Sequence, residues 1–140
     1  VWAASPAEFQ SVYVVFDPVT PSPTPVNVNI PILVGGDTPA AIARAVKLAD
    51  GYFPGEGDID RLRALIGRVH GACETAGRDP ASLEINAMFG TQMSDPKAGI
   101  EEMRAAGVGR IMIPAFFFAG PGGLDRMTAL AEQIMPLAAE

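Results

Sequence analysis

Four consecutive residues, Gly35, Gly36, Asp37 and Thr38, carry groups that could bind an anion. The two glycines lack a Cβ, so the backbone N–H groups around them can approach a bound group closely. The helix expected to begin near Thr38 adds unpaired N–H groups and the positive end of its dipole. A phosphate fits this arrangement, although the carboxylate of Asp37 opposes it unless that side chain turns away to cap the helix. The alternative is a tight strand–helix turn with an ordinary Asp or Thr cap.

Two further segments are weaker candidates for binding. The sequence "AGPGG" (119–123) is a second glycine-rich turn before a helix, but Pro121 removes one N–H donor. Asn86 lies on an expected inner strand, where it could face a ligand or fill a polar layer. His70 is assigned to a solvated helix face, and the chain has one histidine and one cysteine. These counts argue against a metal site and exclude an internal disulfide, and we name no catalytic residue.

The elements that must position these residues alternate between strand and helix. Short apolar runs, three- and four-residue apolar spacing and helix-stop glycines predict four strand–helix pairs within residues 30–140. The strands are expected at 31–36, 52–53, 82–92 and 109–117. Gly51 is predicted to end the first helix in the left-handed conformation. The last helix is expected to bury a stripe that includes Leu124, Met127 and Leu130.

This order predicts an α/β fold with parallel strands joined by right-handed crossovers. Periodicity alone leaves two architectures open, a small doubly wound sheet and part of a (βα)₈ barrel. The preceding segment contains a Val- and aromatic-rich strand (11–19) and then four prolines in "TPSPTPVNVNIP". Because proline lacks an N–H group, this stretch reads as an extended connection.

Composition restricts the class of protein. The chain has 140 residues, of which 49% are hydrophobic and 19% charged, and this is typical of a globular domain. Its net charge of −6 argues against nucleic acid as a partner. No apolar run approaches the roughly 20 residues of a membrane span. The first residues, "VWAASPAEFQ", lack the basic flank of a signal peptide, and we expect a cytoplasmic protein.

The order of motifs resembles the C-terminal half of the bacterial luciferase-like monooxygenase family. The similar pieces are Trp2, an aromatic-rich hairpin with Tyr13 and Phe16, the prolines Pro23 and Pro25, the run from Pro31 to Gly36, and the Ala-Asp-Gly-aromatic stretch from Ala49 to Phe53. "GVGRIMIP" resembles the last strand of the family. Each motif alone is common, but their order and spacing cover almost the whole chain.

The resemblance implies a (βα)₈ TIM barrel that binds FMN or coenzyme F420 and acts on a small-molecule substrate. This chain would supply the last four βα units (30–140), preceded by a hairpin and Pro-rich insertion (1–29). It would be part of a flavin- or F420-dependent oxidoreductase or monooxygenase, with the cofactor phosphate near Gly35–Thr38. The early strands of the family carry much of the pocket and have no counterpart here.

Several alternatives stay open at this stage. The chain could be a catalytically silent half-barrel that serves as a binding or assembly module, or a small flavodoxin-like fold. Four parallel strands without partners leave two sheet edges, which predicts either a homo-oligomer or a missing N-terminal segment. The sequence does not decide between a piece of a longer protein and a shortened gene product, nor whether the chain is active alone.

Overall fold

The computed structural model describes residues 5–138. Trp2, which contributes to the family resemblance, lies outside the described residues. The chain divides after Pro31 into two compact units. Among residues 5–138, no helix combines the length and the apolar character needed to cross a membrane.

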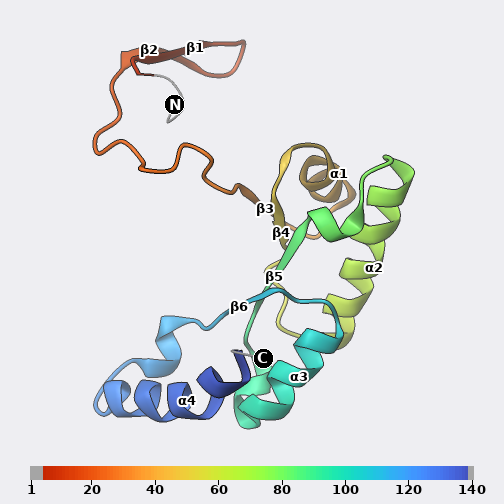
Figure 1. Cartoon of the computed structure of the whole chain (residues 1–140), viewed down its shortest axis with the longest axis vertical. Coiled ribbons are helices and arrows are strands. Elements are labelled where there is room, and N and C mark those ends of the chain that lie inside the picture. Colours follow the sequence, from red (N-terminus) through yellow and green to blue (C-terminus); the bar gives the residue numbers. More distant parts are fainter. Residues whose placement is uncertain (1–4, 139–140) are drawn as a thin grey trace. The chain divides into compact units, whose positions relative to one another are not determined.

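The first unit contains the expected hairpin. Strand β1 (Ala7–Gln10) pairs antiparallel with strand β2 (Val15–Val19), as Figure 1 shows. The rings of Phe9 and Phe16 stack across the pair with their centroids 6.2 Å apart. At the turn, the Ser11 hydroxyl accepts a hydrogen bond from the Val14 N–H at 3.0 Å, so the expected strand at 11–19 begins only after this turn.

The second unit is a four-stranded parallel sheet with four helices, which confirms the four predicted βα units. Its strands are β3 (Leu33–Gly35), β4 (Gly51–Phe53), β5 (Glu84–Met88) and β6 (Arg110–Met112). Its helices are α1 (Pro39–Leu48), α2 (Ile59–Thr75), α3 (Pro96–Ala105) and α4 (Gly123–Ala138).

The strand order distinguishes the two architectures that periodicity left open. The order is β3-β4-β5-β6, so every strand lies beside its neighbour in the sequence. A doubly wound sheet reverses its order at a switch point, and no such reversal occurs among the described strands. Helices α1, α2 and α3 lie along one side of the strands (Figure 1). This arrangement corresponds to an arc of a (βα)₈ barrel.

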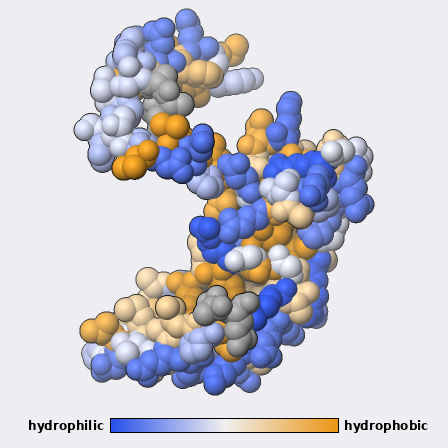
Figure 2. All heavy atoms as spheres, in the orientation of Figure 1, coloured by the Kyte–Doolittle hydropathy of each residue, from blue (hydrophilic) through white to orange (hydrophobic). Residues whose placement is uncertain are grey.

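Alternation along β5 divides the sheet into two faces, as predicted. Ile85 and Ala87 are buried at 3% and 0% exposure in the core beneath the helices. The opposite face carries polar groups, including an ion pair between Glu84 and Arg110 at 3.1 Å. Leu33 also lies on this face and is 38% exposed. Figure 2 shows apolar surface, in orange, exposed along the central part of this unit.

Side-chain caps start the helices where the sequence predicted. Thr38, Asp58 and Asp95 each accept a hydrogen bond from the backbone N–H three residues later. Each bond satisfies one of the N–H groups that the first helical turn leaves without an intrahelical partner. Of the two caps proposed for α1, the structure selects Thr38, with Pro39 at the first helical position.

Three sequence predictions need correction. Gly51 does not end α1 in a left-handed conformation; it lies within β4, where a Cβ would be 2.4 Å from Leu33 Cδ2. The strand predicted at 109–117 ends at Met112, because Pro114 cannot donate a ladder hydrogen bond and a 3-10 turn follows at Ala115–Phe118. In α4, Leu130 is buried, but Leu124 is 70% exposed.

Candidate functional site

The candidate turn lies at the carboxyl edge of the sheet. The four strands are parallel, so their C-terminal ends and the loops that follow them meet at one edge. β3 ends at Gly35, and α1 begins at Pro39, which places residues 35–38 at this edge (Figure 1). Barrel enzymes of this architecture build their active sites from these loops.

The geometry of the turn disfavours a side chain at both glycine positions. A Cβ on Gly35 would lie 3.1 Å from the carbonyl oxygen of Phe53. Gly36 has a φ of +109°, and a Cβ there would lie 3.1 Å from Cβ of Ala41. Residues with a Cβ rarely adopt this φ, so glycine at position 36 allows the backbone to turn from β3 into α1.

A buried tyrosine on the neighbouring strand forms a hydrogen bond to the backbone of this turn. Tyr52 on β4 is 0% exposed, and its hydroxyl donates a 2.6 Å hydrogen bond to the carbonyl oxygen of Gly36. Burial raises the pKa of Tyr52, while Arg68 lowers it and Asp37 raises it further. A tyrosine hydroxyl is already protonated at neutral pH, and this rise in pKa extends the range over which it can act as a donor. The Gly36 N–H donates to the Phe53 carbonyl at 3.3 Å, so β4 bonds to both the N–H and the carbonyl group of Gly36.

The hydrogen bonds of the turn define which donors remain for a ligand. The N–H groups of Gly36 and Ala41 bond to Phe53 and Thr38. Within residues 5–138, the N–H groups of Asp37 and Thr38 have no acceptor. They lie at the start of α1, where the helix dipole favours negative charge. The turn thus offers two backbone donors beside one exposed carboxylate, Asp37.

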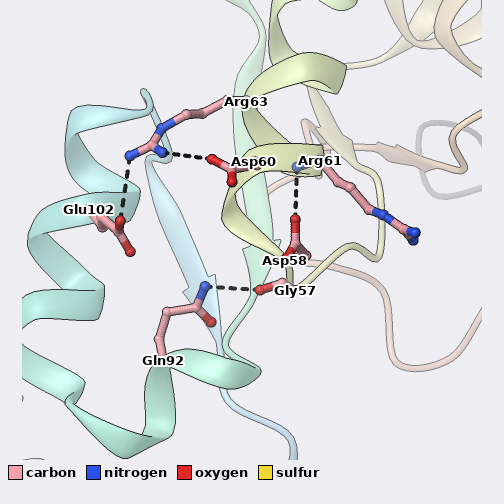
Figure 3. A network of polar contacts seen from close by, with 7 residues as sticks. All are labelled: Gly57, Asp58, Asp60, Arg61, Arg63, Gln92 and Glu102. Carbon is pink, nitrogen blue, oxygen red and sulfur yellow. Dashed lines mark hydrogen bonds and ion pairs between the residues drawn. The ribbon is translucent and has the colours of Figure 1, made fainter.

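The neighbouring loop, which connects β4 to α2, is ordered by its own carboxylate. Glu56 Oε1 accepts hydrogen bonds from the N–H groups of Gly57 at 2.8 Å and Asp58 at 2.9 Å. Beyond this loop, Arg63 on α2 bonds to Asp60 at 3.2 Å and reaches Glu102 on α3 at 3.7 Å, as Figure 3 shows. These ion pairs are exposed, and each contributes little to stability.

Comparison with known proteins identifies the family. The sequence model described as luciferase-like monooxygenase matches residues 1–137. The chain belongs to the luciferase-like monooxygenase family. Uncharacterized proteins from Mycobacterium tuberculosis and Mycobacterium bovis are 36% identical over 96 residues, which cover 68% of this chain and 31% of each relative.

Solved structures support the same fold. An F420-dependent secondary alcohol dehydrogenase matches with a TM-score of 0.63 and 15% identity, over 98% of this chain and 57% of that enzyme. A coenzyme F420-dependent tetrahydromethanopterin reductase from Methanopyrus kandleri matches with a TM-score of 0.58 and 14% identity, over 92% of this chain and 56% of that enzyme. The chain thus spans about half the length of these luciferase-like TIM-barrel enzymes.

The other predicted candidates of this luciferase-like chain lie in different settings. In the "AGPGG" loop, Arg126 donates hydrogen bonds to the carbonyl oxygens of Pro121 at 2.9 Å and Ala119 at 2.8 Å. Two carbonyl oxygens of that loop therefore accept hydrogen bonds from the guanidinium group of Arg126. Asn86 is 0% exposed on the face opposite the helices. Its Nδ2 donates to the Glu84 carbonyl, and its Oδ1 has no partner among residues 5–138.

Sequence reasoning did not identify Tyr52 as part of the turn. The signal available was a tyrosine within an otherwise apolar strand, since a buried hydroxyl must find a hydrogen-bond partner. Nor did it identify Gln92, which is 7% exposed. Within the described ranges, no group of three or more His, Cys, Asp or Glu residues is placed to hold a metal ion.

Proposed function

We propose that this chain is the cofactor-binding part of a luciferase-like oxidoreductase or monooxygenase that uses coenzyme F420 or FMN. Within it, we propose that Gly35, Gly36, Asp37 and Thr38 bind the cofactor phosphate. The proposal is supported by the family, and by two F420-dependent enzymes that share the fold. The chain spans only part of those enzymes, so the activity, the small-molecule substrate and the partners are all proposals. We propose the cytoplasm as the compartment, where the free thiol of Cys73 would stay reduced.

One observation carries the phosphate assignment. The turn between β3 and α1 has no side chain at two successive positions, and the N–H groups of Asp37 and Thr38 are unpaired within the described chain. A Cβ at position 35 or 36 would lie 3.1 Å from the Phe53 carbonyl oxygen or from Cβ of Ala41, so the turn would have to shift to accommodate it. When bound, the cofactor would supply hydride transfer. The residues of this chain would position its phosphate through backbone donors and the α1 dipole.

The test compares ligands that carry the phosphate with ligands that lack it. Fluorescence titration would measure the dissociation constants of FMN against riboflavin, and of F420 against its phosphate-free deazaflavin core. We expect tighter binding of the phosphate-bearing member of one pair. Equal affinity within the bound pair would overturn the phosphate assignment while leaving the cofactor class intact. Binding of none of the four ligands would overturn the proposed function itself.

A second candidate function is a catalytically silent half-barrel that acts as a binding or assembly module. It is favoured by the edges of the sheet, because β3 and β6 each pair on one side only among the described strands. Unpaired strand edges promote association. Under this proposal, light scattering would give a discrete homo-oligomer or a complex with an N-terminal half-barrel segment, and cofactor titration would give no binding.

A further inference from the structure

Gln92 is a buried amide in the loop between β5 and α3. It lies in a 3-10 turn (Thr91–Ser94) and is 7% exposed. An amide costs free energy to bury unless both of its ends find hydrogen-bond partners. A glutamine enclosed within a loop at the carboxyl edge of the sheet therefore points to a specific set of contacts.

Both ends of this amide are paired, and they join two different loops. Gln92 Oε1 accepts a hydrogen bond from the Gly90 N–H at 3.1 Å, within its own loop. Gln92 Nε2 donates to the carbonyl oxygen of Gly57 at 2.9 Å, across to the loop between β4 and α2 (Figure 3). The second bond joins residues 35 positions apart in the chain, so it fixes one loop relative to the other.

Three glycines leave the space that the amide and the loop backbones occupy. A Cβ on Gly57 would lie 3.5 Å from Cα of Gly90, so the two loop backbones pack directly against each other. On α3, a Cβ at Gly99 would lie 2.4 Å from Cβ of Gln92. The helix therefore approaches the glutamine side chain as closely as a backbone can.

We propose that Gln92 is a positioning residue for the ligand site at the carboxyl edge, because it holds residues 54–58 in place as a wall beside the turn at 35–38. The inference rests on the proposed function, since the ligand is the flavin-type cofactor named there. Gln92 acts through the Gly57 carbonyl and the loop, without touching the cofactor. Loss of the Nε2 donor frees the loop and weakens cofactor binding.

The test uses two variants and two readouts. Gln92→Glu keeps the size and the acceptor but loses the donor, and Gln92→Met loses both. Cleavage after Glu56 by a Glu-specific protease, identified by peptide mass, reports on the freedom of the loop. Fluorescence titration with FMN and F420 reports on the cofactor. We expect cleavage after Glu56 to be about tenfold faster, and the dissociation constant of the bound cofactor to rise about fivefold, in both variants.

Arg78→Ala is the matched control. Arg78 bonds to the Ala45 and Val46 carbonyls at the C-terminal end of α1, away from the carboxyl edge of the sheet. The Arg78→Ala substitution should lower the unfolding midpoint without changing cleavage after Glu56 or cofactor affinity. Unchanged cleavage in the Gln92 variants, or faster cleavage with unchanged affinity, would overturn the positioning role. Absence of cofactor binding by the unaltered protein would instead overturn the proposed function, and this inference with it.

Discussion

The hydroxyl of Tyr52 donates a hydrogen bond of 2.6 Å to the carbonyl oxygen of Gly36, 16 residues earlier in the chain. This contact joins the end of β3 to the middle of β4 beneath the proposed phosphate turn. The Gly36 N–H also bonds to β4, so both backbone polar groups of Gly36 are fixed by contacts with this strand. The shape of the turn therefore depends on a residue that need not touch a ligand.

Tyr52→Phe removes this donor and leaves the Gly36 carbonyl without it. A fully buried acceptor that loses its partner costs about 1–3 kcal/mol; because Gly36 is only partly buried, we expect the free energy of unfolding in urea to fall by about 1 kcal/mol, the lower end of that range. The exposed Tyr13→Phe is the control, because its side chain is 95% exposed and it should change nothing. Equal stability of the two variants would show that the Tyr52 hydroxyl does not hold the turn.

Gly51→Ala tests the close packing inside β4. The added methyl group would lie 2.4 Å from Leu33 Cδ2 and 2.8 Å from the Glu84 carbonyl oxygen, so we expect a loss of about 2–3 kcal/mol in unfolding free energy. Gly67→Ala is the matched control in α2, where a Cβ meets no atom within 4 Å. That change should stabilise the chain by up to about 1 kcal/mol. A neutral Gly51→Ala would contradict the packing described here.

Asp37→Asn removes the carboxylate beside the proposed phosphate. Two like charges about 6 Å apart in water repel by roughly 0.7 kcal/mol, so affinity for the phosphate-bearing cofactor should rise about threefold at low salt. Riboflavin or the phosphate-free deazaflavin should bind as before, and added salt should reduce the difference. Thr38 and not Asp37 caps α1, so the unfolding midpoint should stay close to that of the unaltered protein. A similar gain for both ligand forms would argue against a phosphate at this turn.

Arg78→Ala should destabilise α1 at its C-terminal end. The guanidinium donates to the Val46 carbonyl at 2.9 Å and the Ala45 carbonyl at 3.3 Å, and it also bonds to Ser82. Hydrogen bonds from a charged donor contribute about 1.5–3 kcal/mol, and we expect a loss in this range by urea unfolding. Arg44→Ala, at an exposed position of the same helix, should have little effect. Comparable losses of unfolding free energy in the two variants would mean that the positive charge of Arg78, and not its bonds to the carbonyl groups, stabilises α1.

Stability should fall at alkaline pH because of Cys73. Burial raises the pKa of this thiol; Arg78 lowers it, and Asp79 and Glu74 raise it. The folded chain thus holds the proton to higher pH than the unfolded chain, whose thiol pKa is about 8.5. The contribution of the protonated Cys73 thiol to folding stability is fully present below the unfolded-state pKa. It is lost as the pH rises through the folded-state pKa. Urea midpoints between pH 7 and 9.5 should fall less steeply in Cys73→Ala; parallel curves would contradict this.

Local patterns predicted the fold well, and long-range contacts explain what they missed. The alternation in β5 predicted both faces of the sheet, and Asp58 and Asp95 were correctly assigned as caps. Gly51 was misread because its need for glycine comes from Leu33 and Glu84, which lie on other strands. The prediction of a strand over 109–117 was wrong at its C-terminal end because it did not take Pro114 into account.

The same distinction applies to the candidate site. The residues of the turn at 35–38 could be proposed from their types and order alone. Tyr52 and Gln92 could not, because their partners lie 16 and 35 positions away in the chain. Such contacts follow from strand register, which a short apolar run like "GYF" does not specify.

Every ladder of the sheet joins strands that are consecutive in the sequence. During synthesis on the ribosome, each of these strands therefore emerges after the partner it will pair with, and one α-helix separates the two in the sequence. Each ladder closes only the loop of one βα unit, which costs less loop-closure entropy than pairing with a strand farther along the chain. The sheet is thus suited to grow in the direction of translation, with the newest strand always at its edge.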